Sequence, residues 1–222
     1  MPSTKLLSAG YVVLATADAV LAGRPGTTAR RLRHLTKPTL MPLLAAATRH
    51  TQQGAGRSVT AAQALSWGGD VALLGRGDRA FQAGLGSFLG AHLAYVTAFA
   101  LRGDRVTAPP NAGVKGAGAV LLTTGPLMSF AASRTDRRLV APVAAYSTAL
   151  AAMFAAASRL DPALSGRGRR AVQLGAGLFL VSDTLLGVQK FVLRREVPAL
   201  QTAVMATYTA GQGLMAAGTA RL

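Results

Sequence analysis

The chain has 222 residues, of which 50% are hydrophobic and only 14% are charged, and its mean hydropathy is +0.34. Soluble domains usually carry about 25% charged residues, so this composition favours a membrane protein. The net charge of +16 does not indicate nucleic-acid binding, because the basic residues form no single stripe, few aromatic residues lie among them and no binding motif occurs. The absence of cysteine excludes disulfides and thiolate metal sites.

Long apolar runs separated by short basic clusters predict a polytopic transmembrane bundle of about eight helices. A spanning helix needs about 20 mostly apolar residues, and a charge at the bilayer centre costs about 2.5 to 3.5 kcal/mol. We therefore expect an all-α fold, with residues 1–222 forming a single transmembrane domain. The segments expected to be helical are 6–23, 35–49, 59–75, 80–101, 112–133, 138–158, 170–193 and 198–219.

The first two segments have unusual features. Lys5 and the apolar stretch after it are similar to a signal peptide, but no soluble domain follows, so we expect residues 6–23 to be the first spanning helix. The second segment is short and contains Pro38 and Pro42. Proline in a spanning helix is tolerated where neighbouring helices or a cavity cover the freed backbone groups, so we expect such cover here.

The connections between segments are brief and basic. They are expected at 24–33, 102–110, 134–138, 159–170 and 194–195. When the loop Lys and Arg residues are assigned to alternate sides of the membrane, each side receives eleven. The positive-inside rule therefore gives no orientation, and the residues leave the oligomeric state open as well.

Small residues in the expected helices predict close helix packing, because they let backbones approach in lipid. Gly86 and Gly90 form a GxxxG pattern. Further small surfaces are expected at Gly175, Gly177, Gly211 and Gly213.

Ionisable side chains inside apolar segments are functional candidates, because they are costly in lipid. Asp70 lies in the third segment and Asp183 in the seventh. Helical spacing places polar residues on one face of three segments, which predicts a shared polar interior. The three faces contain Gln63, Trp67 and Asp70; Phe88, His92 and Tyr95; and Phe179, Asp183, Gly187 and Lys190.

Purely structural interpretations of the charged candidates remain open. Asp70 and Asp183 could pair with Lys37 and Lys190 only to fix the register of the helices. Lys190 lies near a helix end and could extend its amine to the membrane interface. Asp18 is also near the end of its helix, where we expect it to face a loop.

The aromatic candidates have structural interpretations too. His92 could be a hydrogen-bonded interior residue, Tyr95 and Tyr146 could be interfacial aromatics, and Trp67 is expected to be a packing residue. No metal site is expected, because the three histidines lie far apart and no cysteine is present.

Short motifs follow one another from Lys37 to Phe191. In chain order they are Thr36-Lys37-Pro38, Gly69-Asp70, Phe81-Gln82-Ala83-Gly84-Leu85, Gly90-Ala91-His92-Leu93-Ala94-Tyr95, Tyr146 with Met153, Gly175 to Asp183, and Gln189-Lys190-Phe191. In this order and spacing the chain resembles the YhhN-like membrane proteins, the lysoplasmalogenase family. The first and last helices match only as apolar segments, and Gln189 stands where the family often has Asn.

The resemblance implies an eight-helix membrane enzyme that hydrolyses the vinyl ether bond of lysoplasmalogen. The products would be a fatty aldehyde and glycerophosphoethanolamine or glycerophosphocholine. The two Asp motifs of the family correspond to Asp70 and Asp183, which the resemblance implies as catalytic residues. The partner would be a lysophospholipid in the bilayer, and no metal or organic cofactor is required.

The residue types fit this chemistry. A vinyl ether hydrolyses after protonation at carbon, which needs a proton donor and an anion near the developing cation. Two carboxyl groups in a low-dielectric cavity can supply both, and either Asp70 or Asp183 could be the acid. Five other residues are expected to have supporting roles. Lys37 or Lys190 would hold one carboxylate ionised or bind the lipid phosphate. His92 and Tyr95 would position water or substrate, and Tyr146 would also support the site.

Two other functions fit the same residues. A small proton-coupled transporter also uses buried Asp, His and Lys, and the motif beginning at Asp70 is echoed at Asp183. A scaffold could use the buried charges to fix its assembly. The richness in Ala, Gly and Arg is typical of a GC-rich bacterial genome. It therefore favours a bacterial plasma membrane, where another ether lipid could be the substrate.

Overall fold

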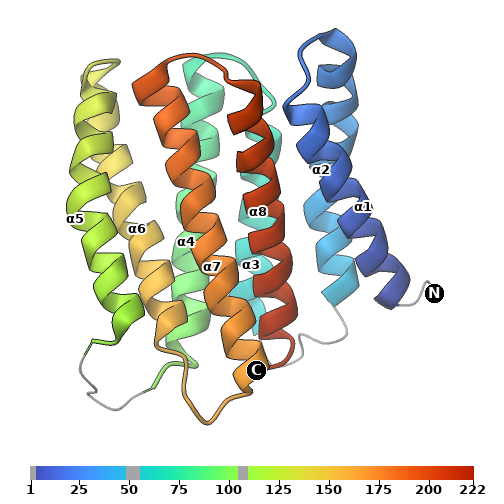
Figure 1. Cartoon of the computed structure of the whole chain (residues 1–222), viewed down its shortest axis with the longest axis vertical. Coiled ribbons are helices and arrows are strands. Elements are labelled where there is room, and N and C mark those ends of the chain that lie inside the picture. Colours follow the sequence, from blue (N-terminus) through green and yellow to red (C-terminus); the bar gives the residue numbers. More distant parts are fainter. Residues whose placement is uncertain (1–3, 49–55, 105–109) are drawn as a thin grey trace.

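The computed structural model describes residues 4–48, 56–104 and 110–222, and these form eight α-helices (Figure 1). The predicted all-helical fold is confirmed. A 3₁₀ turn, η1 (Arg137–Leu139), precedes α6, and a π-helical stretch, η2 (Val188–Leu193), continues α7. The α-helices are α1 (Thr4–Ala22), α2 (Thr27–Thr48), α3 (Gly56–Ala72), α4 (Gly77–Ala100), α5 (Ala112–Ser133), α6 (Val140–Ser158), α7 (Gly166–Gly187) and α8 (Pro198–Thr219).

Consecutive helices pack against each other in pairs along the chain. α1 lies against α2, α3 against α4, α5 against α6 and α7 against α8. α4 also packs on α6, and α8 also packs on α1, so the pairs join into one bundle. In Figure 1, α5 and α6 form one side and α1 and α2 the other, with α3, α4, α7 and α8 between them. Three of these central helices carry the ionisable candidates Asp70, His92 and Asp183.

Within the described residues, five helical stretches are long and apolar enough to cross a membrane. Large apolar side chains point outward from them, among them Leu122 (77% exposed) and Phe130 (61% exposed) on α5. Apolar surface of this kind is unfavourable in water and is typical of contact with lipid. The chain is therefore an integral membrane protein. The stretches are Thr4–Ala22, Gly77–Ala100, Ala112–Ser133, Arg137–Ser158 and Gly166–Leu193.

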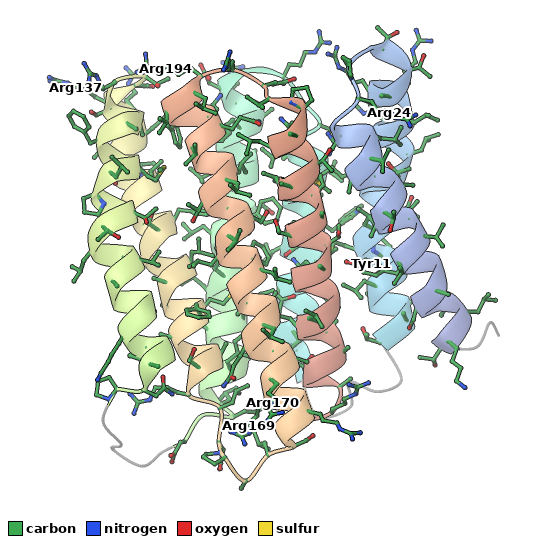
Figure 2. The ribbon with its side chains drawn as sticks, viewed as in Figure 1. Tyr11, Arg24, Arg137, Arg169, Arg170 and Arg194 are labelled. Carbon is green, nitrogen blue, oxygen red and sulfur yellow. The ribbon has the colours of Figure 1, made fainter. Side chains whose placement is uncertain are left out.

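Arginine side chains lie at both ends of the bundle (Figure 2). Arg24, Arg137 and Arg194 are at one end, and Arg169 and Arg170 are at the other. Guanidinium groups at helix ends can extend into the headgroup layer and contact anionic lipid. The assignment of successive basic connections to alternate sides of the membrane therefore agrees with the positions of these arginines.

The helix boundaries agree best with prediction where the sequence has a start signal. α5 and α8 begin and end at the predicted residues. Asn111 caps α5 by accepting a hydrogen bond from the Val114 backbone N–H at 3.0 Å, and Pro198 opens α8. α7 begins at Gly166, four residues earlier than predicted, because the Ser165 side chain caps it.

The connection predicted at 24–33 is wrong over most of its length, because α2 already begins at Thr27. A search for apolar runs misses this first part of α2, where Arg30 and Arg31 lie. Arginine is nevertheless a good helix former. Of the other predicted positions, residue 49 at the end of the second segment and residues 105–109 of the connection 102–110 lie outside the described residues.

The two prolines do not break α2, because a neighbouring helix compensates for one of them. Pro42 has no N–H, so the carbonyl of Pro38, four residues earlier, lacks its usual helical donor. The indole Nε1 of Trp67 on α3 donates to this carbonyl at 2.9 Å. The predicted cover for a freed backbone group is confirmed at Pro38, and Trp67 connects α3 to α2 through it.

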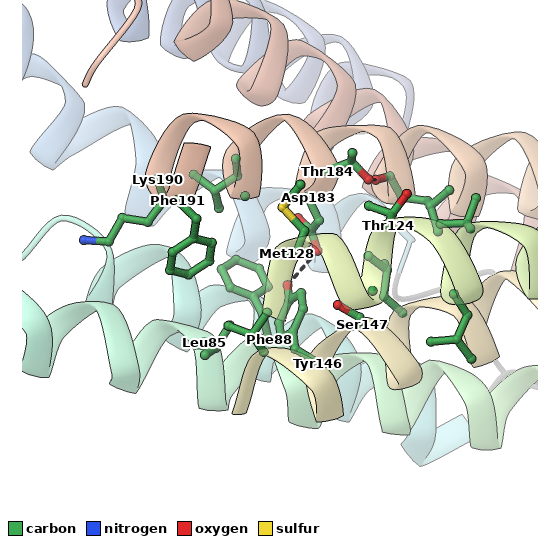
Figure 3. Close-up of a pocket in the computed structure, with 18 of the residues that line it drawn as sticks. Leu85, Phe88, Thr124, Met128, Tyr146, Ser147, Asp183, Thr184, Lys190 and Phe191 are labelled. Atoms are coloured by element: carbon green, nitrogen blue, oxygen red, sulfur yellow. Dashed lines mark hydrogen bonds between the residues drawn. The ribbon is translucent and has the colours of Figure 1, made fainter. Parts of the chain in front are cut away.

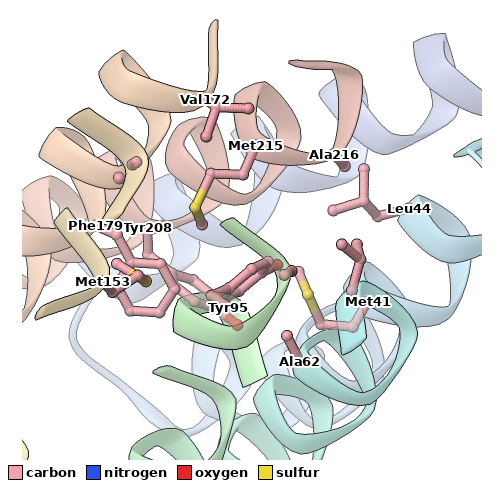
Figure 4. Close-up of a cluster of buried hydrophobic side chains, with 14 of the residues drawn as sticks. Met41, Leu44, Ala62, Tyr95, Met153, Val172, Phe179, Tyr208, Met215 and Ala216 are labelled. Atoms are coloured by element: carbon pink, nitrogen blue, oxygen red, sulfur yellow. The ribbon is translucent and has the colours of Figure 1, made fainter. Parts of the chain in front are cut away.

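The core lies where α1, α2, α3, α4, α6, α7 and α8 meet (Figure 4). Tyr95 and Phe99 stack there with ring centroids 5.6 Å apart and are fully buried. Methionines from several helices fill the space around the aromatic rings, as flexible side chains do in irregular gaps. The core residues labelled in Figure 4 are Met41, Leu44, Ala62, Tyr95, Met153, Val172, Phe179, Tyr208, Met215 and Ala216.

α7 and α8 approach each other closely at two pairs of glycines. A Cβ atom at Gly175 would lie 2.7 Å from the backbone oxygen of Gly211, and one at Gly218 would lie 2.8 Å from that of Gly168. The predicted packing role of Gly175 and Gly211 is confirmed. A Cβ atom at Gly86 would meet nothing within 4 Å, whereas one at Gly90 would lie 3.2 Å from a methyl group of Leu65, so the predicted GxxxG pattern packs closely at Gly90 only.

We expect Gly175→Ala to lower the free energy of unfolding by about 1 to 3 kcal/mol, because the backbone of α8 must move to accommodate the methyl group. Gly86→Ala is the matched control at an exposed helix position. There the better helix propensity of alanine should raise stability by up to about 1 kcal/mol. Thermal unfolding in detergent, followed by circular dichroism, compares the variants. A wild-type melting temperature for Gly175→Ala would contradict the close contact.

Candidate active site

Asp70 is a buried carboxylate near the end of α3, with 1% of its surface exposed. Lys37 on α2 places Nζ 3.4 Å from Oδ1, and the Tyr208 hydroxyl on α8 donates to Oδ2 at 2.6 Å. The pairing of Asp70 with Lys37 considered from the sequence is confirmed. A buried carboxylate is tolerated only when a cation and hydrogen bonds replace its water, and here two other helices supply them.

Asp183 on α7 has a different set of partners. The Tyr146 hydroxyl on α6 donates to its Oδ2 at 2.6 Å (Figure 3), and His92 Nε2 on α4 lies 3.2 Å from the same oxygen. The rings of His92 and Tyr146 meet edge to face with centroids 5.0 Å apart. Among the described residues, Oδ1 accepts no hydrogen bond. Asp183 therefore has one oxygen held by the protein and one available to a ligand.

Asp183 and Tyr146 line an apolar cavity enclosed by α4 to α7, η2 and Leu73, which follows α3 (Figure 3). The space in this cavity, its open side included, is about 780 Å³. Most of its wall is hydrocarbon, so Asp183 is a polar group at a site otherwise suited to an aliphatic chain. The other lining residues are Leu73, Phe81, Leu85, Phe88, Val120, Leu121, Thr124, Gly125, Met128, Val143, Ser147, Leu150, Leu180, Thr184, Leu186, Gly187, Lys190 and Phe191.

A second, basic cavity adjoins the apolar cavity. Its space, the open side included, is about 1890 Å³. Four residues, Leu73, Phe81, Leu186 and Lys190, line both cavities, so the two meet along a common rim. The remaining residues of the basic cavity are Arg33, Lys37, Gly75, Arg76, Gly77, Arg134, Thr135, Gln189, Arg194, Arg195, Glu196, Gln201, Val204 and Met205.

Aromatic rings lie between the two carboxylates. The ring of Tyr208, which bonds Asp70, is 5.3 Å from that of Phe179, and Phe179 is 4.9 Å from His92, which bonds Asp183. No described hydrogen bond or ion pair joins the two carboxylates directly. The two carboxylates therefore belong to separate polar clusters, where the sequence predicts one shared polar interior.

Comparison with known families identifies the chain. The model of the YhhN family matches residues 32–219, which is most of the sequence. The chain belongs to the YhhN family. The match includes the last helix, for which the sequence showed only an apolar segment. No curated protein and no solved structure matched.

Lys190 does not pair with Asp183 in this YhhN family member. Its Nζ lies 4.6 Å from the centroid of the Phe81 ring, and the side chain extends away from Asp183 in Figure 3. The face predicted for the seventh segment is confirmed in part, because Asp183, Gly187 and Lys190 all line the apolar cavity. Phe179 from the same predicted face is fully buried and packs on His92 instead.

Tyr95 lies away from both cavities of the YhhN fold. Its hydroxyl donates to Gln212 Oε1 at 2.6 Å, and Gln212 Nε2 donates to Ser66 Oγ at 2.9 Å. This buried chain of hydrogen bonds joins α3, α4 and α8. The role expected for Tyr95 in positioning water or substrate therefore has no support in its contacts, whereas His92 and Tyr146 both contact Asp183.

The sequence analysis missed Tyr208, the hydrogen-bond donor to Asp70. Tyr208 and Gln212 are four residues apart in the last predicted helix, so two polar side chains share one helix face, and this spacing could have revealed them. The prediction that Asp18 faces a loop is wrong. Asp18 is fully buried and accepts hydrogen bonds from Thr36 at 2.6 Å and Arg33 at 3.3 Å.

Proposed function

We propose that this YhhN family protein is a lysoplasmalogenase, a membrane hydrolase that cleaves the vinyl ether bond of a lysophospholipid. The products are a fatty aldehyde and the glycerophospho-headgroup, such as glycerophosphoethanolamine or glycerophosphocholine. One observation carries the proposal. A carboxyl group, Asp183, lines an apolar cavity that can receive an alkenyl chain, and a cavity lined by cations adjoins it.

In the proposed reaction Asp183 is the proton donor. Its carboxyl proton is transferred to the alkenyl carbon that is not bonded to the ether oxygen, and an oxocarbenium ion forms at the other alkenyl carbon. The Asp183 carboxylate left behind stabilises this cation and then accepts a proton from the attacking water. The resulting hemiacetal collapses as its hydroxyl proton moves to the glycerol oxygen and the carbon–oxygen bond breaks. General acid catalysis of this kind contributes about 10²- to 10⁴-fold.

The contacts of Asp183 support this role. Tyr146 and His92 hold Oδ2, so the carboxyl group keeps one orientation while the other oxygen is available in the cavity. The hydroxyl of Tyr146 also stabilises the carboxylate after its proton has left. Positioned donors near the reacting group are effective because they need no reorganisation during the reaction.

Asp70 and Lys37 have a second role in this proposal. Asp70 lines neither cavity, but its partner Lys37 lines the basic cavity. Asp70 therefore holds an ammonium group where the lipid phosphate would bind, and Lys190 at the common rim would contact the phosphate from α7. Replacing Asp70 with Asn should abolish turnover, because it changes the position and charge of Lys37.

We further propose a bacterial plasma membrane location and a single transmembrane domain over residues 1–222, as the sequence predicts.

The test is aldehyde release from a vinyl ether lysophospholipid by the detergent-purified protein, measured by mass spectrometry. We expect Tyr146→Phe to lower turnover about 10- to 100-fold, because a hydrogen bond to a charged group is worth about 1.5 to 3 kcal/mol. Tyr95→Phe is the matched control, since Tyr95 loses a hydrogen bond of the same length but lines neither cavity. It should keep wild-type turnover and lose only stability.

Two results would refute the proposal. One is the absence of aldehyde from folded wild type with both ethanolamine and choline headgroups. The other is accumulation of the lipid in proteoliposomes without chemical change, which would favour a transporter. Equal loss of turnover in Tyr146→Phe and Tyr95→Phe would remove Tyr146 from its proposed role.

A further inference from the structure

The basic cavity has far more positive than negative charge. Seven of its lining side chains are cationic, and one, Glu196, is acidic. Two of the cations face a carboxylate behind the cavity wall, because Arg33 pairs with Asp18 at 3.3 Å and Lys37 with Asp70 at 3.4 Å. Among the residues that line the cavity, the other five cations have only the Glu196 carboxylate to balance their charge. Like charges gathered in a cavity repel each other, and a bound anion removes that repulsion.

The contacts of three of these five cations orient them without neutralising their charge. Arg194 donates to the backbone carbonyls of Phe191 at 3.5 Å and Arg134 at 3.4 Å. Lys190 lies over the ring of Phe81, and the Arg134 guanidinium lies over a phenylalanine ring at 5.6 Å. Carbonyl and ring contacts hold a cation in place but supply no negative charge to compensate it.

Arg76 and Arg195 complete the set of five. Both are exposed to the cavity and take part in no hydrogen bond or ion pair among the described residues. They lie on segments that are far apart in sequence, one just before α4 and one between η2 and α8. The basic cavity therefore has cations without partners on two separate segments of the chain.

The backbone at this end of α7 departs from regular α-helix. η2 is a π-helix that carries Lys190, and Arg194 follows it with φ of 53°, in the left-handed region. Both features are energetically unfavourable and are found frequently at functional sites. They lie where three cations of the basic cavity, Lys190, Arg194 and Arg195, follow one another within six residues.

The basic cavity lies next to the cavity that Asp183 lines. The phosphate of such a lipid is separated from the ether oxygen only by the glycerol carbons. A vinyl ether bound beside Asp183 therefore places its phosphate near the common rim, where Lys190 lies. The group beyond the phosphate then meets Arg76, Arg194 and Arg195.

We propose that the basic cavity selects a lysophospholipid whose headgroup is a phosphate monoester, without a cation of its own. This inference rests on the proposed vinyl ether hydrolysis and puts a phosphate monoester in place of the ethanolamine or choline headgroup as the preferred substrate. A phosphate monoester carries about −1.5 to −2 charges at pH 7 and offers three acceptor oxygens. An ethanolamine or choline headgroup adds a positive charge, for which the cavity has only the Glu196 carboxylate. The ring of Phe81 cannot bind the headgroup cation by a cation–π contact, because Lys190 already lies over it.

The first arm of the test compares three substrates that share one alkenyl chain. They are 1-alkenylglycerol 3-phosphate and its ethanolamine and choline esters, in mixed micelles with wild-type protein. We expect kcat/KM for the phosphate monoester to be at least about tenfold higher, because each charge-assisted hydrogen bond gained is worth about that factor. Equal kcat/KM for the three headgroups would overturn the selection and leave the proposed hydrolase standing.

The second arm removes the two cations without partners. Arg76→Gln/Arg195→Gln should reduce the preference for the phosphate monoester over the choline ester by about tenfold. Arg24→Gln is the matched control, because Arg24 is an exposed arginine at the same end of the bundle but does not line the cavity (Figure 2). An unchanged preference in the double variant, or an equal loss in Arg24→Gln, would overturn the inference.

The third arm measures binding without turnover. The saturated ether 1-alkylglycerol 3-phosphate cannot be protonated at carbon, so it should raise the melting temperature of the wild type and not of the double variant. Glycerol 3-phosphate and inorganic phosphate are the controls for a free anion, and equal stabilisation by either would overturn a lipid headgroup as the ligand. Stabilisation by the saturated ether without aldehyde from any substrate would support the anion site and refute the hydrolase.

Discussion

Asp183→Asn should reduce aldehyde release by about 10²- to 10⁴-fold, because it removes the proposed proton donor. Asparagine has nearly the same shape as aspartate and still presents an oxygen to the Tyr146 hydroxyl, which lies 2.6 Å from Oδ2. Its amide cannot transfer a proton to carbon. We therefore expect the variant to fold, bind the saturated ether analogue and release almost no aldehyde. Mass spectrometry of the aldehyde and the melting temperature, measured on one preparation, check both parts.

Asp78→Asn is the matched control for this experiment. Asp78 is an exposed carboxylate in the first turn of α4 and lines neither cavity. The change has the same chemistry but should leave turnover at the wild-type level. Turnover above a tenth of wild type in folded Asp183→Asn would show that the proton comes from another group. Loss of the folded state in Asp183→Asn would instead assign Asp183 a structural role.

Lys37→Met should destabilise the protein by about 3 to 5 kcal/mol, because it leaves the buried Asp70 carboxylate without its cation. The double variant Lys37→Met/Asp70→Asn removes both charges and should recover most of this loss. The amide oxygen that Asp70→Asn introduces can still accept the hydrogen bond of the Tyr208 hydroxyl. Asp70→Asn alone should be less harmful than Lys37→Met, because Lys37 lines the basic cavity whereas Asp70 lines neither cavity.

Thermal unfolding of the wild type, both single variants and the double variant gives the coupling between the two charges. Additive losses in this cycle would contradict a direct interaction between Lys37 and Asp70. The same four proteins also test the proposed function, because the double variant should fold and yet release no aldehyde. Wild-type turnover in that folded double variant would remove Asp70 and Lys37 from the reaction.

The helical fold could be predicted from the sequence because hydrophobic runs and start signals are local. Asn111 and Pro198 mark helix starts that residue types alone reveal. The start of α2 could not be found in this way, because its first turns are basic. Its arginines lie at the end of the bundle, where a cation remains near water and headgroups.

The composition of the site was predicted better than its arrangement. Asp70, Asp183 and His92 stand out because an ionisable side chain in an apolar run is rare. Their grouping into two clusters depends on which helices are neighbours, and helical periodicity within one segment carries no information about that. The assignment of Tyr146 to Asp183 and of Tyr208 to Asp70 therefore required the structure.

The π-helix at Val188–Leu193 makes the length of this segment critical. A π-helical turn holds one residue more than an α-helical turn in otherwise continuous helix. Deleting a single residue just after Gly187 should let α7 continue as regular α-helix. That deletion removes only the extra residue, so Arg194 would keep nearly its direction relative to Asp183. A second deletion would rotate everything up to Arg194 by about 100°, the turn of one α-helical residue. A two-residue deletion would therefore separate the reaction from headgroup recognition, whereas a one-residue deletion would leave them together.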